Sequence, residues 1–243
     1  MTRQMRLKQH HVDLLRREVA DPGPQLLDGF RPATDADYAE SVARMLATRP
    51  PGGFWLFGIS SLIWRPETAF TERQQGVALG WHRRFCLGWD YRFRGCREAP
   101  GLMMALDRGG RCRGMLYRLP EETLEEELHK LIRREQSMVP SAFPWRWIDV
   151  QTTDERIRAL SFPMDRKSPR YISGLSDDEM ADMLATAYGY RGSMVEYLHS
   201  TVEMLESVGI HDRYLWKMQE MVADRIEARF PHAREPEAEP EPA

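Results

Sequence analysis

Residues 54–64 read Phe54-Trp55-Leu56-Phe57-Gly58-Ile59-Ser60-Ser61-Leu62-Ile63-Trp64. The apolar run up to Phe57 predicts a buried β-strand, which Gly58 and the two serines end before apolar character resumes. A strand that ends in small residues can aim several backbone N–H groups at one point, which suits an anionic ligand or a developing oxyanion. The alternative is a bulged barrel strand, and the pattern taken alone favours that alternative.

Short β-rich runs continue outward from this segment. They cover residues 54–59, 77–86, 102–106 and 113–118, and turns are expected at Gly88, Gly95, Pro100-Gly101 and Gly109-Gly110. Two more strands are predicted over residues 145–151 and 156–162. This many short strands indicates a barrel or a strongly curved sheet.

Helical patterns lie on both sides of the strands. Thr34 caps a predicted helix over residues 35–47, and Pro120 opens another that has acidic residues near its positive end. A Ser-x-x-Glu capping box at Ser176 and Glu179 begins the last helical region. Its predicted helices cover residues 176–188, 193–207 and 212–229. We therefore expect an α+β fold, a small mixed β-barrel flanked by helices.

Composition limits the classes of partner and compartment. The 34 basic and 37 acidic side chains are dispersed, with no basic block that would neutralise a phosphate backbone, so no nucleic-acid partner is expected. The strongly apolar run of residues 54–64 is far shorter than the roughly 20 residues of a membrane helix, so no membrane partner is expected either. Three cysteines without a paired spacing favour a reducing compartment, and the sequence predicts a cytoplasmic protein.

Helical geometry directs attention to Glu135. Leu124, Leu128, Leu131 and Ile132 form one apolar stripe, and Glu135 follows Leu124 by 11 residues, which at about 100° per residue is about three turns plus 20°. The carboxylate therefore continues the buried face, in the last turn of the helix. Burial and the negative helix end both raise a carboxyl pKa toward neutrality, as a general base requires. The alternative is that the helix ends at Arg134 and Glu135 only pairs with an arginine.

A basic turn supplies a second candidate site. Arg92, Arg94 and Gly95 form a glycine-containing turn that can hold a substrate carboxylate, although most such turns are simply solvated. The seven histidines show neither HExxH nor clustered ligand spacing, so no metal site is predicted.

Taken together, these segments resemble the ChaC family of γ-glutamylcyclotransferases, particularly its bacterial members. The family's glycine-rich substrate loop, Phe-Gly-Tyr-Gly-Ser-Leu, corresponds to residues 57–62. Further matches are Gly80-Trp81-His82-Arg83-Arg84-Phe85-Cys86-Leu87, Arg94-Gly95, Pro100-Gly101, residues 114–120, Arg134-Glu135 and Glu196-Tyr197-Leu198. They occur in the family's order, from about Gly53 to the last helix.

The resemblance implies an enzyme that converts glutathione to 5-oxoproline and cysteinylglycine without a metal or organic cofactor. It implies Glu135 as the catalytic base and a substrate-binding set of Leu56, Phe57, Gly58, Ile59, Ser60, Ser61 and Arg94. With the helical pattern before Gly53 and the Glu, Pro and Ala composition of the last residues, the sequence predicts three parts: an N-terminal helical extension (1–52), a cyclotransferase domain (53–230) and a disordered, acidic, Pro-rich tail (231–243).

The chain departs from the family pattern at several positions. Ile59 stands for the loop tyrosine, Ser60 for its second glycine and Met194 for an asparagine, and Phe143 is the nearest aromatic to a tyrosine missing after Arg-Glu. Two alternatives therefore stay open. One is a binding or regulatory protein that has lost turnover, and the other is a cyclotransferase for other γ-glutamyl amines.

Overall fold

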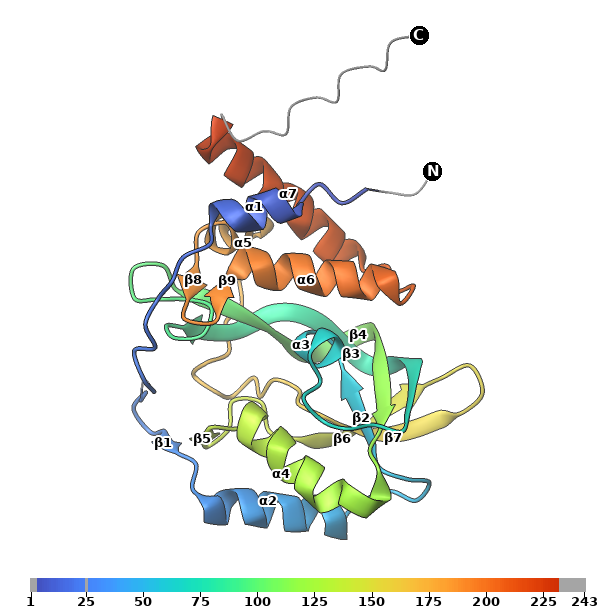
Figure 1. The fold of residues 1–243 in the computed structure, drawn as a ribbon. Helices are drawn as coiled ribbons and strands as arrows, with labels where there is room; N and C mark the ends of the chain where they lie inside the picture. Colours follow the sequence, from blue (N-terminus) through green and yellow to red (C-terminus); the bar gives the residue numbers. More distant parts are fainter. Residues whose placement is uncertain (1–3, 25, 232–243) are drawn as a thin grey trace.

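A closed five-stranded barrel forms the centre of the computed structural model, which describes residues 4–24 and 26–231 (Figure 1). Its strands follow the order β2-β4-β3-β6-β7, and a parallel pairing of Leu56 with Leu160 closes β2 onto β7. The bounds are β2 Trp55–Gly58, β3 Glu72–Asp90, β4 Gly101–Arg118, β6 Arg146–Gln151 and β7 Arg156–Ser161. The predicted α+β barrel flanked by helices is confirmed.

The long β3–β4 ribbon corrects two sequence predictions. Gly88, where a turn was expected, lies within β3, and the strand register shifts there between Leu87 and Asp90. The runs 102–106 and 113–118 are a single strand, β4, and the turn expected at Gly109-Gly110 is wrong. Both glycines have positive φ, 103° and 72°, which a turn and a bulge require alike. Here three steps on β4 oppose two on β3 between the pairs Leu79–Arg111 and Trp81–Arg108, so the glycines form a bulge that bends the ribbon.

Helix α4, Leu124–Glu135, lies below the barrel and follows a short 3₁₀ turn, η1, Glu121–Thr123 (Figure 1). The predicted helix α2, Asp35–Ala47, packs against α4 and has Thr34 as its N-cap. Strand β1, Arg31–Pro32, pairs with β5, Met138–Val139, so the N-terminal segment runs past the end of α4.

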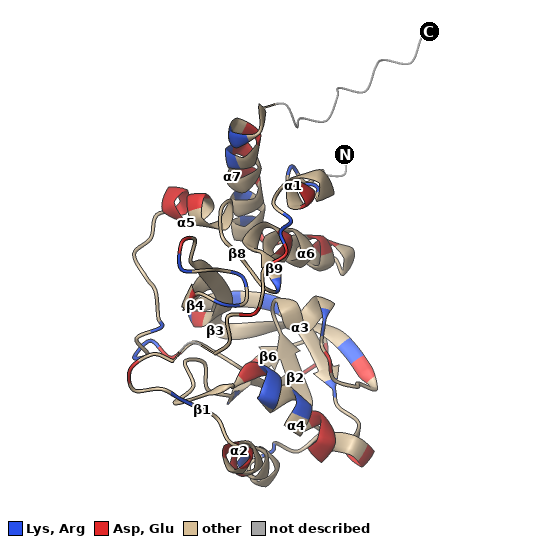
Figure 2. Ribbon diagram, turned by 60° about the vertical axis from the view of Figure 1, so that its left-hand side comes forward, with Lys and Arg blue, Asp and Glu red and all other residues tan. Residues whose placement is uncertain are grey.

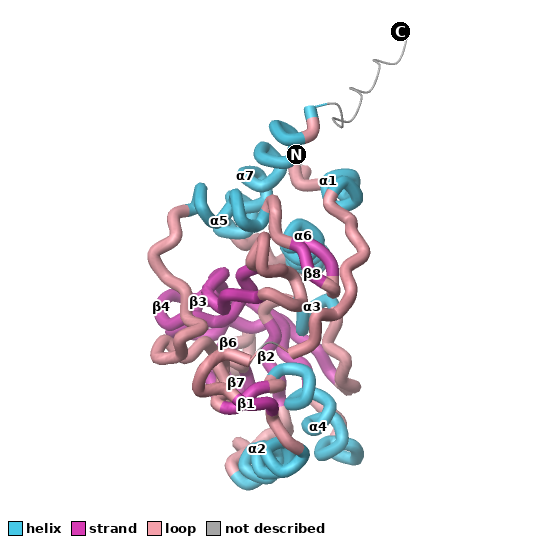
Figure 3. Tube along the Cα trace, turned by 90° about the vertical axis from the view of Figure 1, so that its left-hand side faces the viewer, coloured by secondary structure: helices cyan, strands magenta, loops and turns pink. Residues whose placement is uncertain are grey.

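Four helices pack on the opposite side of the barrel, so that helices lie at both ends of the molecule with the strands between them (Figure 3). They are α1 Gln9–Leu14, α5 Asp177–Leu184, α6 Met194–Ser207 and α7 Arg213–Arg229, and a small hairpin of β8 Tyr188–Gly189 and β9 Gly192–Ser193 precedes α6. The Ser176–Glu179 capping box is confirmed. Helix α5 ends at Leu184, four residues before the predicted end.

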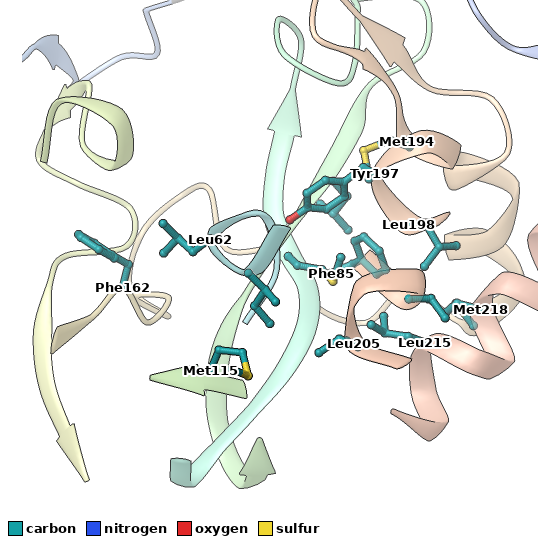
Figure 4. Packing of buried hydrophobic residues seen from close by; sticks show 14 of the residues in the cluster. Leu62, Phe85, Met115, Phe162, Met194, Tyr197, Leu198, Leu205, Leu215 and Met218 are labelled. Carbon is teal, nitrogen blue, oxygen red and sulfur yellow. The ribbon is translucent and has the colours of Figure 1, made fainter. Parts of the chain in front are cut away.

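The main hydrophobic core joins these helices to the barrel. Phe85 on β3 points toward the two C-terminal helices and belongs to one buried cluster with their Leu205, Leu215 and Met218 (Figure 4). The N-terminal extension belongs to the same core, since Leu7 is fully buried in it. The backbone N–H of Leu7 donates to the buried Gln219 side chain on α7 at 2.7 Å.

Charge is interspersed over the described surface, with both signs on α4 and α7 (Figure 2). None of the helices in the described residues is long and apolar enough to cross a membrane. The tail predicted to be disordered covers residues 231–243. All of it except Pro231 lies outside the described residues.

Candidate active site

A cavity of about 450 Å³ lies where the loop after β2, the C-terminal end of α4 and helix α6 meet the β3–β4 ribbon. Its lining includes Ser60, Glu135 and Tyr197, which are far apart in the sequence. A volume of this size falls within the range of about 300–1,000 Å³ that small-molecule sites occupy. The cavity therefore has room for one small substrate.

Glu135 is the last residue of α4 and lines this cavity. The apolar stripe that predicted its direction is confirmed, because Leu124, Leu128, Leu131 and Ile132 are all buried. The Glu135 side chain is only 16% exposed. Burial raises the pKa of Glu135 above its ordinary value of 4.5, Arg134 opposes this effect, and Glu67 adds to it.

Arg134 connects Glu135 to the loop after β2. Its Nε lies 3.0 Å from the Glu135 carboxylate, and its Nη2 donates to the Ser61 hydroxyl at 3.2 Å. A third donor, Nη1, bonds the carbonyl of Arg65. The Arg-Glu pair therefore fixes the carboxylate relative to the loop, so the pairing that sequence offered as an alternative coexists with a position in the cavity.

The loop itself requires close backbone packing. A Cβ on Gly58 would lie 3.0 Å from Cβ of Leu62, and one on Gly114 would lie 2.4 Å from the Gly58 carbonyl oxygen. The loop then turns directly into a short helix, α3 Ser61–Trp64, because the Ser60 carbonyl accepts from the Ile63 N–H at 2.7 Å. Within the described residues, the N–H groups of Ser60 and Ser61 have no hydrogen-bond acceptor.

Tyr197 also lines the cavity and was not among the predicted site residues. It extends from α6 toward the barrel (Figure 4), and its hydroxyl interacts with the Ser60 side chain. Burial raises the pKa of this phenol, so it stays protonated as a donor near the Glu135 carboxylate. The Glu-Tyr-Leu triplet was the only sequence signal for it.

Arg94 lines the cavity as expected, but its charge is already partnered. Its Nη1 forms an ion pair with Glu196 and donates to the Ser193 carbonyl at 3.3 Å, and its guanidinium lies 5.8 Å from the centre of the Tyr197 ring. The turn before it is held by buried Asp90, which accepts from the Arg94 N–H at 2.6 Å.

Arg170 is another of the six arginines in the cavity lining, and it was not among the predicted site residues. Its Nε donates to the Gly88 carbonyl at 3.3 Å, and no carboxylate of the described chain lies within ion-pair distance. Burial lowers the pKa of Arg170, and nearby Asp90 opposes that effect. Nothing in the local sequence distinguishes this arginine from a solvated one.

The structure brings most of the predicted site together. Phe57, Ile59, Ser60, Ser61, Arg94 and Glu135 all line the cavity, whereas Leu56 and Gly58 lie behind the lining. In the described part of the chain, no group of three or more His, Cys, Asp or Glu is placed to hold a metal ion.

Comparison with known proteins gives one consistent family. The model of the ChaC-like protein family matches residues 54–225. A glutathione-specific gamma-glutamylcyclotransferase of Escherichia coli (strain K12) is 40% identical over 195 residues, covering 79% of this chain and 83% of the relative. A glutathione-specific gamma-glutamylcyclotransferase 1 of Mus musculus is 27% identical over 77% of this chain and 84% of its own length.

Among solved structures, the fold resembles a γ-glutamylcyclotransferase specific to glutathione from yeast. The TM-score is 0.63 at 20% identity, over 71% of this chain and 96% of the yeast chain. This likeness confirms the predicted barrel architecture.

Proposed function

The chain belongs to the ChaC-like protein family, and we propose that it is a γ-glutamylcyclotransferase that cleaves glutathione to 5-oxoproline and cysteinylglycine. The relative that is 40% identical carries this activity in its name, and the match covers most of both chains. The observation that carries the proposal is the largely buried Glu135 carboxylate in a cavity of substrate size, held beside the loop by Arg134.

The reaction needs no external nucleophile. The α-amine of the γ-glutamyl group attacks the γ-carbonyl carbon of the same residue, forming the C–N bond of a five-membered lactam. The C–N bond to cysteine then breaks, and its nitrogen leaves as an amine. Since both reacting groups belong to one substrate, the protein has to hold a cyclised conformer and move protons.

Glu135 acts as the base in this scheme. Its raised pKa makes the carboxylate a better proton acceptor. It accepts a proton from the substrate ammonium and passes it to the leaving nitrogen. The N–H groups of Ser60 and Ser61, which have no acceptor in the described chain, stabilise the oxyanion that develops on the γ-carbonyl oxygen. Tyr197 supports the loop through Ser60.

Glutathione also carries two carboxylates, which require cations. Arg170 fits this role because its guanidinium lines the cavity without an ion-pair partner among the described residues. Arg94 stays a proposed contact as well, although Glu196 already neutralises it. The two arginines can be separated by mutation.

Two alternatives follow from the changed loop residues: a protein that has lost turnover and a cyclotransferase for other γ-glutamyl amines. A protein that has lost turnover would tolerate a filled site, yet the cavity is open and Glu135 lines it, which supports catalysis. Ile59 is buried against the barrel core, so this position supplies an apolar contact in place of the family's phenol.

We also place the protein in the cytoplasm. Its proposed substrate is a thiol kept reduced there, and all three cysteines are free in the structure.

The proposal is tested by measuring 5-oxoproline release by the purified wild-type chain from glutathione, γ-glutamylcysteine and γ-glutamylalanine. We expect the highest kcat/KM with glutathione. A higher value with γ-glutamylalanine would support the alternative amine substrates. Release from none of the three would contradict the enzymatic function.

A further inference from the structure

Arg83 on β3 is buried and contacts the loop after β2 from outside the lining of the active-site cavity. Its side chain is 1% exposed, and it is not part of the cavity lining. Nε donates to the Ile59 carbonyl at 2.6 Å, Nη2 donates to the Arg113 carbonyl at 2.8 Å, and Nη1 pairs with the Asp212 carboxylate. One guanidinium therefore joins the loop, strand β4 and the start of α7.

The Ile59 carbonyl needs such a partner because it lies just beyond the β-ladder. The last pair of β2 with β4 is Gly58 with Met115, so strand pairing ends one residue earlier. A charged donor in a buried setting makes a stronger hydrogen bond than a neutral N–H does. Asp212 balances the charge, and as the N-cap of α7 it is itself held by the N–H groups of Tyr214 and Leu215.

The hydrogen bond to the Ile59 carbonyl also affects the Ser60 N–H, which belongs to the same peptide group. The Ile59–Ser60 peptide is trans, so the Ser60 N–H points opposite to the Ile59 carbonyl and away from Arg83. Ser60 lines the cavity, and its N–H has no acceptor within the described residues. Because both groups belong to one planar peptide, the hydrogen bond from Arg83 to the Ile59 carbonyl also fixes the direction of the Ser60 N–H.

We propose that Arg83 is a positioning residue for catalysis, which orients the Ser60 N–H toward the developing oxyanion by holding the Ile59 carbonyl on the opposite side of the peptide plane. This role rests on the proposed cyclotransferase function. It gives a physical reason for an arginine at this point of β3, where an apolar residue would leave the Ile59 carbonyl without a donor among the described residues.

A second, larger cleft of about 1090 Å³ makes the role testable by chemical rescue. Arg83, Arg84, Arg113 and Asp212 all line it, so a small cation can reach the space that a truncated Arg83 leaves without passing through the active site. Arg84 provides a matched control. It is the neighbouring arginine on β3, its charge lies 3.7 Å from Asp107, and no contact joins it to the loop among the described residues.

The experiment measures kcat and KM for glutathione in the wild type, Arg83→Ala and Arg84→Ala, each with and without added guanidinium chloride. Since losing one oxyanion donor costs about 10²–10³ in kcat, we expect a loss approaching that size in Arg83→Ala with little change in KM. Guanidinium chloride should raise kcat of Arg83→Ala by at least roughly tenfold, and sodium chloride at equal ionic strength should not. Arg84→Ala should keep the wild-type kcat.

Amide hydrogen exchange of residues 58–61 gives a readout that needs no turnover, and faster exchange in Arg83→Ala alone is expected. An inactive wild type would contradict the proposed function, while the exchange result would still report on the loop. An active wild type with full kcat in Arg83→Ala would overturn the positioning role, as would a loss that guanidinium does not restore. If Arg83→Ala does not fold, Arg83→Lys replaces it, with partial kcat expected and wild-type kcat overturning the role.

Discussion

Helix α4 carries two inward-facing glutamates, and they differ in what surrounds them. Glu127, with a side chain 6% exposed, accepts from the Ala69 N–H at 2.8 Å and from Lys130 Nζ at 2.9 Å. Glu135, two turns later, lines a cavity and has Arg134 as its ion-pair partner. Burial alone therefore does not distinguish the proposed catalytic base from a structural carboxylate, and the two glutamates differ in that only Glu135 lines the cavity.

The largest expected effect comes from neutralising these glutamates one at a time. Glu135→Gln should lower kcat by about 10²–10⁴, the contribution of a general base. Glu127→Gln should keep kcat close to the wild-type value, because its carboxylate contacts no part of the cavity. Steady-state 5-oxoproline release measures both, and equal losses in the two variants would remove the distinction.

The next largest effect is expected from replacing two of the cavity arginines, Arg170 and Arg94. Arg170 is unpaired within the described residues and Arg94 is paired, so Arg170→Met should raise KM for glutathione more than Arg94→Met does. A lost charge-assisted hydrogen bond of about 1.5–3 kcal/mol corresponds to roughly 10- to 100-fold in KM. A larger KM effect in Arg94→Met would assign the carboxylate contact to Arg94.

Stability should show the reverse order for the glutamates. Glu127→Gln should lower the free energy of unfolding by about 1–2 kcal/mol, because a buried acceptor of two hydrogen bonds loses its ion pair with Lys130. Glu126→Gln is the matched control, since that exposed residue contacts the same lysine. Urea denaturation of both variants measures the difference, and equal stability would show that Glu127 is not a structural anchor.

The smallest effect is on pH dependence. Burial raises the pKa of Glu135 above 4.5 and the base must be ionised, so kcat/KM should rise with pH through a midpoint above 4.5. Arg134→Met removes a charge that lowers this pKa, so the acid limb should move to higher pH. The exposed Arg133, paired with Asp35, is the control, and Arg133→Met should leave the limb in place.

The same pKa shift affects stability, with a defined sign. A raised folded-state pKa means that Glu135 contributes stability below its unfolded pKa and loses it as pH rises through the folded value. Glu135→Gln should therefore become more stable relative to the wild type as pH increases through that window. Thermal denaturation at several pH values measures the trend, and a constant difference would mean that the pKa is not raised.

Local sequence patterns correctly predicted several helix features. The apolar stripe of α4 predicted the inward direction of Glu135, and Thr34 and Ser176 predicted helix starts, because each signal lies within a few residues of its consequence. Gly109-Gly110 was misread as a turn, since positive φ serves both a turn and a bulge and only the partner strand decides between them.

The supporting residues of the site could not be predicted in this way. Arg134 reaches Ser61 across 73 positions, and Arg83 reaches Ile59 across 24. Glu127 was overlooked although it follows Leu124 by three residues on the same helix, because its partner Ala69 lies on a distant loop. Such roles depend on tertiary contacts that no local pattern specifies.

The measurement that tests the central claim most directly is single-turnover formation of 5-oxoproline from glutathione, with enzyme in excess, for the wild type and Glu135→Gln. This removes product release and isolates ring closure. If Glu135 is the base, the rate constant should be lower by about 10²-fold or more in the variant, while the enzyme concentration for half-saturation stays similar. An unchanged rate constant would contradict Glu135 as the base.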